Sequence, residues 1–301
     1  MTGEVVRRSV TVHGTRISYL GVADQSAGPL VLLIHGSGMS ARYWVEQLRG
    51  LAGAVVAIDL PGHGESAGPA ARTLEEDVDL TAAFADAVTD GPVVAVGHSL
   101  GGAIGLALAA RHPEAVRGVV LLSSCARLRA AESPARWLLP FVPAPMRREL
   151  LFSAASRLLF APGASGATVS FGMQELRRCR PETLARDVAL ARSMDMTAAA
   201  QALRVPALVL CGSRDQVTPP ALSRELHALI AGSRLALIEG AGHMVHMEAS
   251  GVVNQEIDRF ATALASEPLV PRRGSPAVAR RRAPSMLRRL RRRLQALLGR
   301  G

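Results

Sequence analysis

The sequence predicts an α/β fold with a mostly parallel, doubly wound sheet, and three observations support this prediction. Short apolar runs rich in Val, Ile and Leu recur along the chain, as in strands buried on both faces of a parallel sheet. The run at residues 92–96 gives way across glycines to an Ala- and Leu-rich helical segment. The 301 residues, with 49% hydrophobic content, suffice for one large core that carries an inserted segment.

The predicted strands share one pattern, an apolar run that ends at a polar or glycine-containing turn. A strand-like alternation opens the chain, and buried strands are then predicted at residues 30–34, 54–58, 92–96, 119–124, 205–210 and 235–238. A helix is predicted at 102–110, and a closing helix begins near Met247 and Glu248. This order places several loops at the carboxyl edge of the sheet, where sites form in open α/β sheets.

A long helical stretch interrupts the strands, because about 80 residues without a strand-like run separate 119–124 from 205–210. Prolines divide this stretch, and helices are predicted at residues 146–160 and 182–203. We expect most of its large apolar side chains to pack and a minority to face a pocket for an apolar acyl or alkyl group. These side chains are Trp137, Leu138, Leu139, Phe141, Leu151, Phe152, Leu158, Leu159, Phe160, Phe171 and Met194.

The pentapeptide Gly97-His98-Ser99-Leu100-Gly101 is the most informative motif, because it joins the strand at 92–96 to the helix at 102–110. Such a G-x-S-x-G turn holds its serine in a strained conformation at the sheet edge. Glycines two residues before and after the serine let the strand and helix approach closely. The helix N-terminus would stabilise negative charge that develops there, so Ser99 is the candidate nucleophile.

An acid and a base follow later strands. Asp215 comes after the strand at 205–210, and His243 comes after the strand at 235–238. Both loops lie at the predicted carboxyl edge, so we expect His243 to take the serine proton while Asp215 fixes its tautomer. His246 is the rival base, but it lacks the preceding glycines. The rival acids Asp59 and Asp195 are expected in a structural turn and on a helix of the inserted stretch.

The remaining histidines are given structural roles. Alternation along the strand predicts that His98 points away from Ser99. His63 lies in a turn, where a local hydrogen bond is the preferred interpretation. Surface positions are predicted for His13, His112 and His227.

These motifs resemble those of the α/β-hydrolase superfamily over roughly residues 5–265, including the chain order Ser, Asp, His. His35-Gly36-Ser37-Gly38 is similar to the family's oxyanion-hole loop, and residues 59–66 match its D-x-P-G-x-G-x-S turn. The resemblance implies an oxyanion hole made by the backbone N–H groups of Ser37 and Leu100. It also implies a core in two parts, 1–124 and 205–266, with a helical cap at 125–204 inserted after the sixth strand.

The predicted activity is hydrolysis of a carboxylic ester, lactone or thioester through an acyl-enzyme, with a small apolar substrate. Two alternatives stay open, a carbon–carbon bond hydrolase of ring-cleavage products and a non-catalytic ligand-binding or scaffold protein of the same fold. The elbow Gly97-His98-Ser99 departs from the G-N-S sequence of the carbon–carbon hydrolases. No metal, nucleotide or flavin motif is evident, and the predicted chemistry needs no cofactor. The oligomeric state is not predicted.

The charge and the cysteine content limit which binding partners and which cellular compartment are expected. Cys125, Cys179 and Cys211 lack metal-type spacing, and the first residues lack an apolar signal region, so a cytoplasmic protein with reduced thiols is expected. The net charge of +10 comes from the segment 267–301, which holds 11 of the 35 basic residues and leaves 24 against 25 acidic ones. Nucleic acid is therefore not expected as a partner.

The end of the basic segment has an amphipathic pattern of leucines and arginines. At 286–298 leucines share one face of a possible helix and arginines the rest, which predicts peripheral contact with an anionic membrane.

Overall fold

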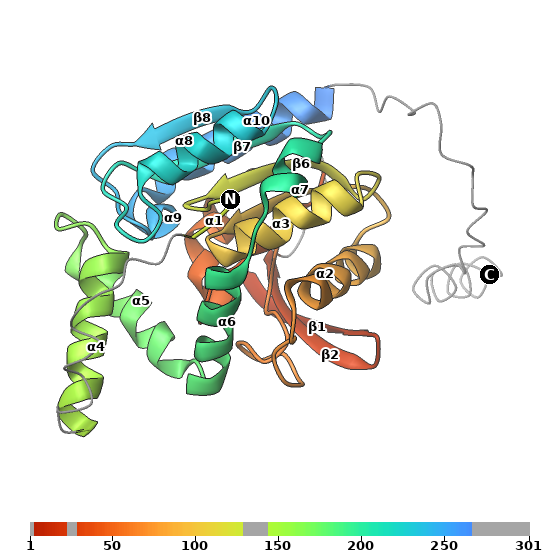
Figure 1. Ribbon diagram of the computed structural model, residues 1–301. Coiled ribbons are helices and arrows are strands. Elements are labelled where there is room, and N and C mark those ends of the chain that lie inside the picture. The colour runs from red at the N-terminus through yellow and green to blue at the C-terminus, as the bar shows by residue number, and fades with distance from the viewer. Residues whose placement is uncertain (1–2, 23–28, 129–143, 267–301) are drawn as a thin grey trace. The chain divides into compact units, whose positions relative to one another are not determined.

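The computed structural model describes residues 3–22, 29–128 and 144–266 (Figure 1). The basic segment 267–301, with its predicted membrane-binding helix, lies outside the described residues. So do four of the large apolar side chains of the inserted stretch, Trp137, Leu138, Leu139 and Phe141.

Eight strands form one sheet in the order β1-β2-β4-β3-β5-β6-β7-β8. Strand β2 pairs antiparallel with β1 and with β4, and all later pairings are parallel, so the sheet is mostly parallel as predicted. The strands are β1 (Val5–Val12), β2 (Thr15–Val22), β3 (Val31–Ile34), β4 (Val55–Ile58), β5 (Val93–His98), β6 (Val116–Leu122), β7 (Ala207–Gly212) and β8 (Arg234–Ile238).

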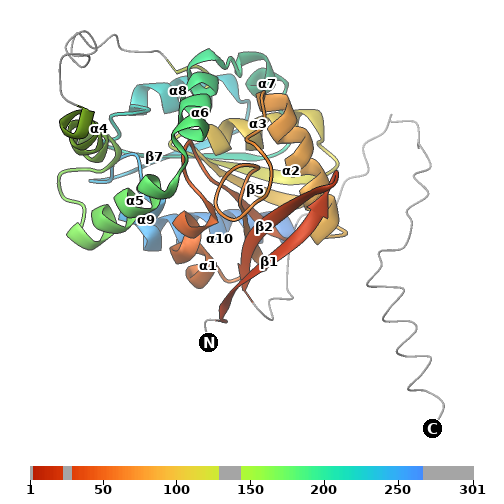
Figure 2. The ribbon, with the colours of Figure 1, turned by 90° about the horizontal axis from the view of Figure 1, so that it is seen from below.

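Helices cover both faces of this sheet (Figure 2). One face carries α2 (Leu74–Val88), α3 (Leu100–Arg111), α7 (Thr197–Ala202) and α8 (Pro220–Leu229). The other face carries α1 (Val45–Gly50), α9 (Val245–Glu248) and α10 (Ser250–Ser266), with the short 3-10 helix η1 (Ala41–Trp44) before α1. Leu32 and Ile34 of β3 pack into the first layer, and Val31 and Leu33 pack into the second. The apolar runs are continuous because successive side chains serve opposite faces.

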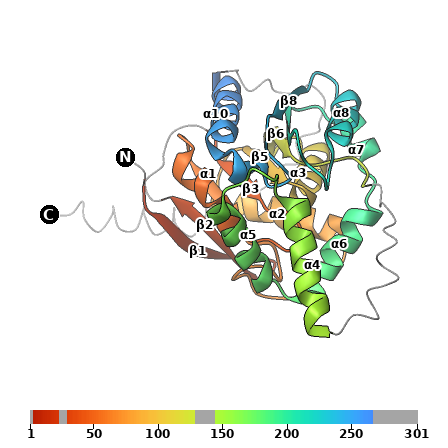
Figure 3. The ribbon, with the colours of Figure 1, turned by 90° about the vertical axis from the view of Figure 1, so that its left-hand side faces the viewer.

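The inserted stretch between β6 and β7 is helical, with α4 (Ala144–Leu159), α5 (Gly166–Arg178) and α6 (Pro181–Ser193) in front of the strands in Figure 3. Helix α5 was not predicted, although Ser165 gives a sequence signal for its start. The Ser165 hydroxyl accepts a hydrogen bond from the Thr168 N–H and caps the helix.

The single helix predicted at 182–203 is wrong, because α6 ends at Ser193 and α7 begins at Thr197. The Met196 N–H donates to the Ala126 carbonyl instead of continuing α6, and the Asp195 carboxylate accepts from the Thr197 N–H. Asp195, expected on a helix, therefore lies in the break, where it also pairs with Arg127 at 2.5 Å. Local capping and a contact with the core outweigh the continuous helical pattern.

A small apolar cluster joins the insertion to the core, and its buried members are Met39, Tyr43, Phe160, Met173, Leu176 and Met244. Packing is less complete on α4, where Leu151 and Leu158 are 49% and 47% exposed. None of the helices in the described part of the chain combines the length and the apolar character needed to cross a membrane.

Candidate active site

Ser99 lies at the sharp turn between β5 and α3, with φ 52° and ψ −118°. A non-glycine residue rarely adopts this conformation, which costs on the order of 1–3 kcal/mol and is held here by the surrounding backbone. A Cβ atom at Gly97 would lie 2.1 Å from the Gly101 carbonyl oxygen, and one at Gly101 would lie 2.3 Å from the Ile34 oxygen. The turn thus requires glycine at both positions, for the steric reason that the sequence indicates.

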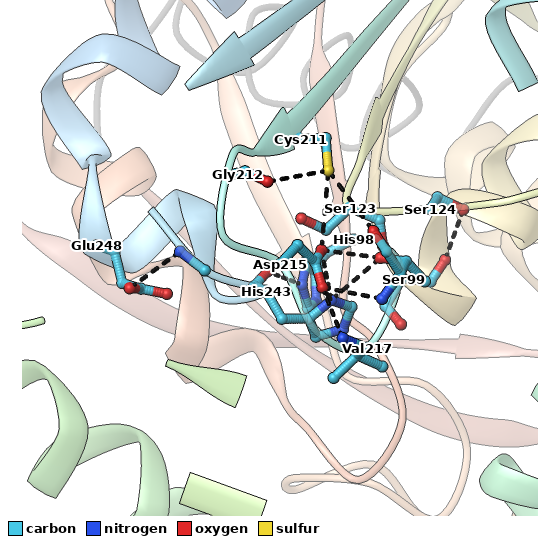
Figure 4. A network of polar contacts seen from close by, with 12 residues as sticks. His98, Ser99, Ser123, Ser124, Cys211, Gly212, Asp215, Val217, His243 and Glu248 are labelled. Atoms are coloured by element: carbon cyan, nitrogen blue, oxygen red, sulfur yellow. Dashed lines mark hydrogen bonds and ion pairs between the residues drawn. The ribbon is translucent and has the colours of Figure 1, made fainter. Parts of the chain in front are cut away.

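His243 and Asp215 form a buried pair close to Ser99 at the carboxyl ends of the strands (Figure 4). The Nδ1 atom of His243 lies 2.9 Å from Oδ2 and 3.1 Å from Oδ1 of the carboxylate. An ionised carboxylate only accepts, so Nδ1 carries the proton and Nε2 of the neutral ring keeps its lone pair. Within the described residues Nε2 makes no hydrogen bond, so it is available to accept a proton.

The Asp215 carboxylate is held by donors of its own loop. Its Oδ1 atom accepts from the N–H groups of Val217 and Thr218, each at 2.9 Å, and the Thr218 hydroxyl lies 2.9 Å from Oδ2. Burial acts to raise the pKa of Asp215, but the electrostatic interaction and hydrogen bond with His243, together with the Thr218 donors, outweigh it and lower the pKa. The carboxylate is therefore ionised at neutral pH and can stabilise a positive charge on His243.

Thr218 is a site residue that the sequence reasoning missed. Its hydroxyl is 2.9 Å from the Ser123 carbonyl oxygen as well as from Asp215, so it joins the ends of β6 and β7. A signal was present in the run Asp215-Gln216-Val217-Thr218, since an aspartate often accepts from N–H groups two and three residues later.

The loop after β3 passes beside the elbow, because a Cβ atom at Gly36 would lie 3.2 Å from the Ser99 Cβ. Ser37 follows Gly36 in this loop, and Leu100 is the first residue of α3. Among the described residues, neither the Ser37 N–H nor the Leu100 N–H has an intramolecular acceptor. The two backbone groups predicted for the oxyanion hole are therefore available donors in segments that adjoin Ser99.

His98 contacts the loop that carries His243. Its ring contacts the rings of His243 and His246, with centroids 4.8 and 4.5 Å away, and its Nε2–H donates to the His243 carbonyl at 3.0 Å. Burial and the neighbouring histidines hold the pKa of His98 well below its usual range, so the ring is neutral. His98 was expected only to point away from Ser99, and sequence reasoning missed its bond to the His243 loop.

The rival base and the rival acid have structural surroundings. His246 is fully buried between Trp44 and His98, and burial, with a smaller electrostatic effect of His243, lowers its pKa to about 3. Its contacts are with rings, and no contact with Asp215 is found among the described residues. Asp59 accepts from the Ala41 N–H at 2.7 Å and from Arg7 at 2.6 Å, as expected of a residue that holds a turn.

Glu248 connects the His243 loop to the insertion. One of its carboxylate oxygens accepts from the Gly242 N–H at 3.1 Å and from the Ala161 N–H, just after α4, at 2.9 Å. The Met244 N–H also donates to the Leu159 carbonyl at 3.0 Å. The loop that carries His243 is therefore tied to the end of α4.

The three cysteines are free thiols, and burial raises the pKa of Cys125 and Cys211 to about 12 and that of Cys179 to about 11. The described residues hold no group of three or more His, Cys, Asp or Glu side chains placed to bind a metal ion.

Comparison with known proteins identifies the family. The model of the alpha/beta hydrolase family matches residues 31–256, and the chain belongs to this family. It is 34% identical over 237 residues to a pimeloyl-[acyl-carrier protein] methyl ester esterase of Neisseria meningitidis, which covers 73% of this chain and 89% of the relative.

Two solved structures share the fold across most of the chain. A thermophilic esterase is 30% identical with a TM-score of 0.73, covering 87% of this chain and 99% of its own. An enol-lactonase from Burkholderia xenovorans is 25% identical with a TM-score of 0.73, covering 85% of this chain and 100% of its own. The predicted α/β-hydrolase fold is confirmed, and the esterases among the relatives bear out the predicted class of enzyme, a carboxylic-ester hydrolase.

Proposed function

We propose that the protein hydrolyses a carboxylic ester, or a related lactone or thioester, through an acyl-enzyme on Ser99. The observation that carries the proposal is the state of His243, whose Nδ1 is bound by Asp215 while Nε2 stays available beside a strained serine. A histidine arranged in this way can take the serine proton and later return it.

The reaction then runs in two halves. Ser99 Oγ bonds to the acyl carbon as its proton passes to His243 Nε2, and the carbon–oxygen bond to the alcohol breaks as the alcohol takes that proton. Water next adds to the acyl carbon and gives a proton to His243. The bond to Ser99 breaks, the acid leaves and the proton returns to Oγ. The Ser37 and Leu100 N–H groups would stabilise the oxyanion of each intermediate.

The substrate class is inferred from the insertion and from the relatives. We infer that 125–204 acts as a cap over Ser99 and supplies an apolar acyl pocket, since its cluster at Phe160, Met173 and Leu176 reaches Met39 and Met244 beside the two catalytic loops. The relatives named above act on a methyl ester and on an enol-lactone, so both substrate types belong in an assay.

Covalent labelling of Ser99 by a fluorophosphonate tests the proposal, with Ser99→Ala as the control. We expect stoichiometric labelling of the folded protein and none of the control. Turnover of p-nitrophenyl esters of increasing chain length, beside lactones and acyl-thioesters, then defines the substrate. A folded protein without an adduct would favour the non-catalytic ligand-binding protein, and turnover of ring-cleavage products alone would favour the carbon–carbon hydrolase.

We also propose that the segment 286–298 makes a reversible contact with anionic membranes. The support is its sequence, in which leucines on one helical face suit a lipid surface and arginines suit acidic headgroups. The full-length protein should co-sediment with anionic vesicles, less so at high salt, and deletion of 268–301 should abolish binding with soluble-ester turnover unchanged. Equal vesicle binding by the truncated protein would contradict the proposal.

A further inference from the structure

A buried aspartate of the insertion touches the loop that carries Ser37. Asp187 lies on α6 and is fully buried. Its Oδ2 atom accepts from the Gly38 N–H at 2.8 Å and lies 2.8 Å from Nε2 of His63. Its Oδ1 atom accepts from Arg186 at 2.8 Å. A side chain of the insertion thus binds the backbone one residue beyond Ser37.

Both ring nitrogens of His63 have partners in this cluster. Its Nδ1 atom lies 3.0 Å from the Pro61 carbonyl oxygen, and its Nε2 atom faces the Asp187 carboxylate. Both ring nitrogens of His63 therefore face oxygen acceptors. Burial acts to raise the pKa of Asp187, but the donors His63, Gly38 and Arg186 outweigh it and lower the pKa. The buried carboxylate is ionised and fully paired, which such a charge requires.

The backbone on either side of Ser37 is fixed by separate contacts. The Gly36–Ser37 peptide is held through the Gly36 carbonyl, which accepts from the His35 ring at 2.9 Å and from the Met39 N–H at 3.2 Å. The Ser37–Gly38 peptide is held through the Gly38 N–H by Asp187. Because a peptide unit is planar, the contacts of the Gly36 carbonyl set the plane of the Ser37 N–H, and the Asp187 contact fixes the adjoining peptide so that the backbone at Ser37 is held on both sides.

Gly38 also meets the insertion by packing. Its φ is +68°, and a Cβ atom there would lie 2.6 Å from Cδ1 of Leu184 on α6 and 3.1 Å from Cδ1 of Leu176 on α5. The loop therefore has no room to move toward α6. Loss of the Asp187 acceptor would leave the Gly38 N–H buried without a partner, and rotation of the Ser37–Gly38 peptide would then be the way to relieve it.

We propose that Asp187 is a positioning residue for the oxyanion hole: it holds the Ser37–Gly38 peptide so that the Ser37 N–H stays directed at the developing oxyanion. The inference rests on the proposed function, in which Ser37 is an oxyanion donor. In this role the insertion contributes to the chemical step as well as to binding, because the acceptor for the Gly38 N–H comes from α6.

Two triple variants that differ only at residue 187 test the acceptor, with the other side-chain partners of Asp187 replaced by uncharged residues. His63→Gln and Arg186→Met are combined with Asp187→Leu in one protein and with Asp187→Asn in the other, so that only the second can accept from the Gly38 N–H. Single variants Asp187→Ala and Asp77→Asn are compared as well. Asp77 is the other buried carboxylate bound to Arg186, at 2.5 Å, and lies on α2, and within the described residues it makes no hydrogen bond to the loop of Ser37.

The readouts separate positioning from stability. We expect kcat for a p-nitrophenyl ester to be about 10-fold to 100-fold lower with Leu than with Asn at 187, with KM within about twofold. A trifluoromethyl ketone, which forms a tetrahedral adduct on Ser99, should lose affinity by the same factor. Asp187→Ala should behave like the Leu protein. Asp77→Asn should lower stability and leave kcat within about twofold, because it touches no oxyanion donor.

Each remaining outcome is decisive. Equal kcat in the Leu and Asn proteins, or a lower kcat with unchanged ketone affinity, overturns the positioning role while the proposed function stands. Absence of fluorophosphonate labelling in the wild-type protein overturns the proposed function, and the inference with it.

Discussion

His243 and His63 each face a buried aspartate at similar range, 2.9 Å from His243 Nδ1 to Asp215 Oδ2 and 2.8 Å from His63 Nε2 to Asp187 Oδ2. They differ at the second ring nitrogen. In His63 the second nitrogen, Nδ1, lies 3.0 Å from the Pro61 carbonyl oxygen, so both ring nitrogens face acceptors and neither is free. In His243 the second nitrogen, Nε2, makes no hydrogen bond within the described residues, so it is available to accept a proton from the serine.

A short contact between a histidine and a carboxylate therefore does not by itself make a proton-transfer site. The partner of the other nitrogen decides whether the pair can act in catalysis or serves to join two segments.

Loss of either reacting group should abolish turnover. We expect Ser99→Ala and His243→Ala each to lower kcat by about 10⁴-fold or more, with the fold retained, because each removes a group of one proton-transfer unit. The double variant should be hardly slower than either single one. Steady-state kinetics on a p-nitrophenyl ester, with circular dichroism for folding, measures this, and additive losses would argue against a shared mechanism.

The two pairs should respond very differently to neutral replacements. Asp215→Asn should lower kcat by about 10³-fold to 10⁴-fold, because the amide favours the wrong tautomer of His243. His63→Gln should lower kcat by less than about fivefold, since a glutamine amide can still donate one hydrogen bond to Asp187. The same ester assay compares them. Similar losses in the two variants would mean that His63 also takes part in proton transfer.

Thr218→Val should have a moderate effect. It removes the hydroxyl 2.9 Å from Asp215 Oδ2, and a hydrogen bond to a charged group contributes about 1.5–3 kcal/mol, so kcat should fall about 10-fold to 100-fold. Thr218→Ser keeps the hydroxyl and should stay within about threefold of the wild type. Equal kinetics of the Val and Ser proteins would show that the hydroxyl does not support the carboxylate.

The smallest effect concerns stability and pH. Burial lowers the pKa of His246 to about 3, whereas the unfolded chain binds a proton at about 6.5, so stability is complete above pH 6.5 and is lost as pH falls toward 3. As the pH falls from 7 to 5, His246 should therefore lower the unfolding free energy of the protein by about 2 kcal/mol. Urea unfolding at the two pH values should show that His246→Gln loses less unfolding free energy than the wild type, by that amount.

Buried His35 and His98 also have lowered pKa values and are present in both proteins, and burial, the largest cause of the shift of His98, is the same in both. The same loss of stability in wild type and His246→Gln would mean that His246 takes up a proton in the folded protein near pH 5.

Much of the fold and of the candidate site follows from local sequence patterns. Ser99, Asp215 and His243 each come directly after an apolar run, and parallel strands bring their carboxyl ends to one edge, so adjacency along the sheet can be inferred from order along the chain. The elbow is equally local, because its glycines and its serine lie within five residues.

The partners of these residues were decided by tertiary structure. Asp187 meets Gly38 across 149 residues and His63 across 124, and helical periodicity marks α6 as half buried without naming what it is buried against. The break at Asp195 depends in the same way on a contact between Met196 and Ala126. Local patterns determine which segments form strands, turns and helices, since these depend on nearby backbone and side-chain chemistry. Whether a histidine that faces an aspartate keeps its second ring nitrogen free depends on packing between distant segments, and only the folded chain settles that.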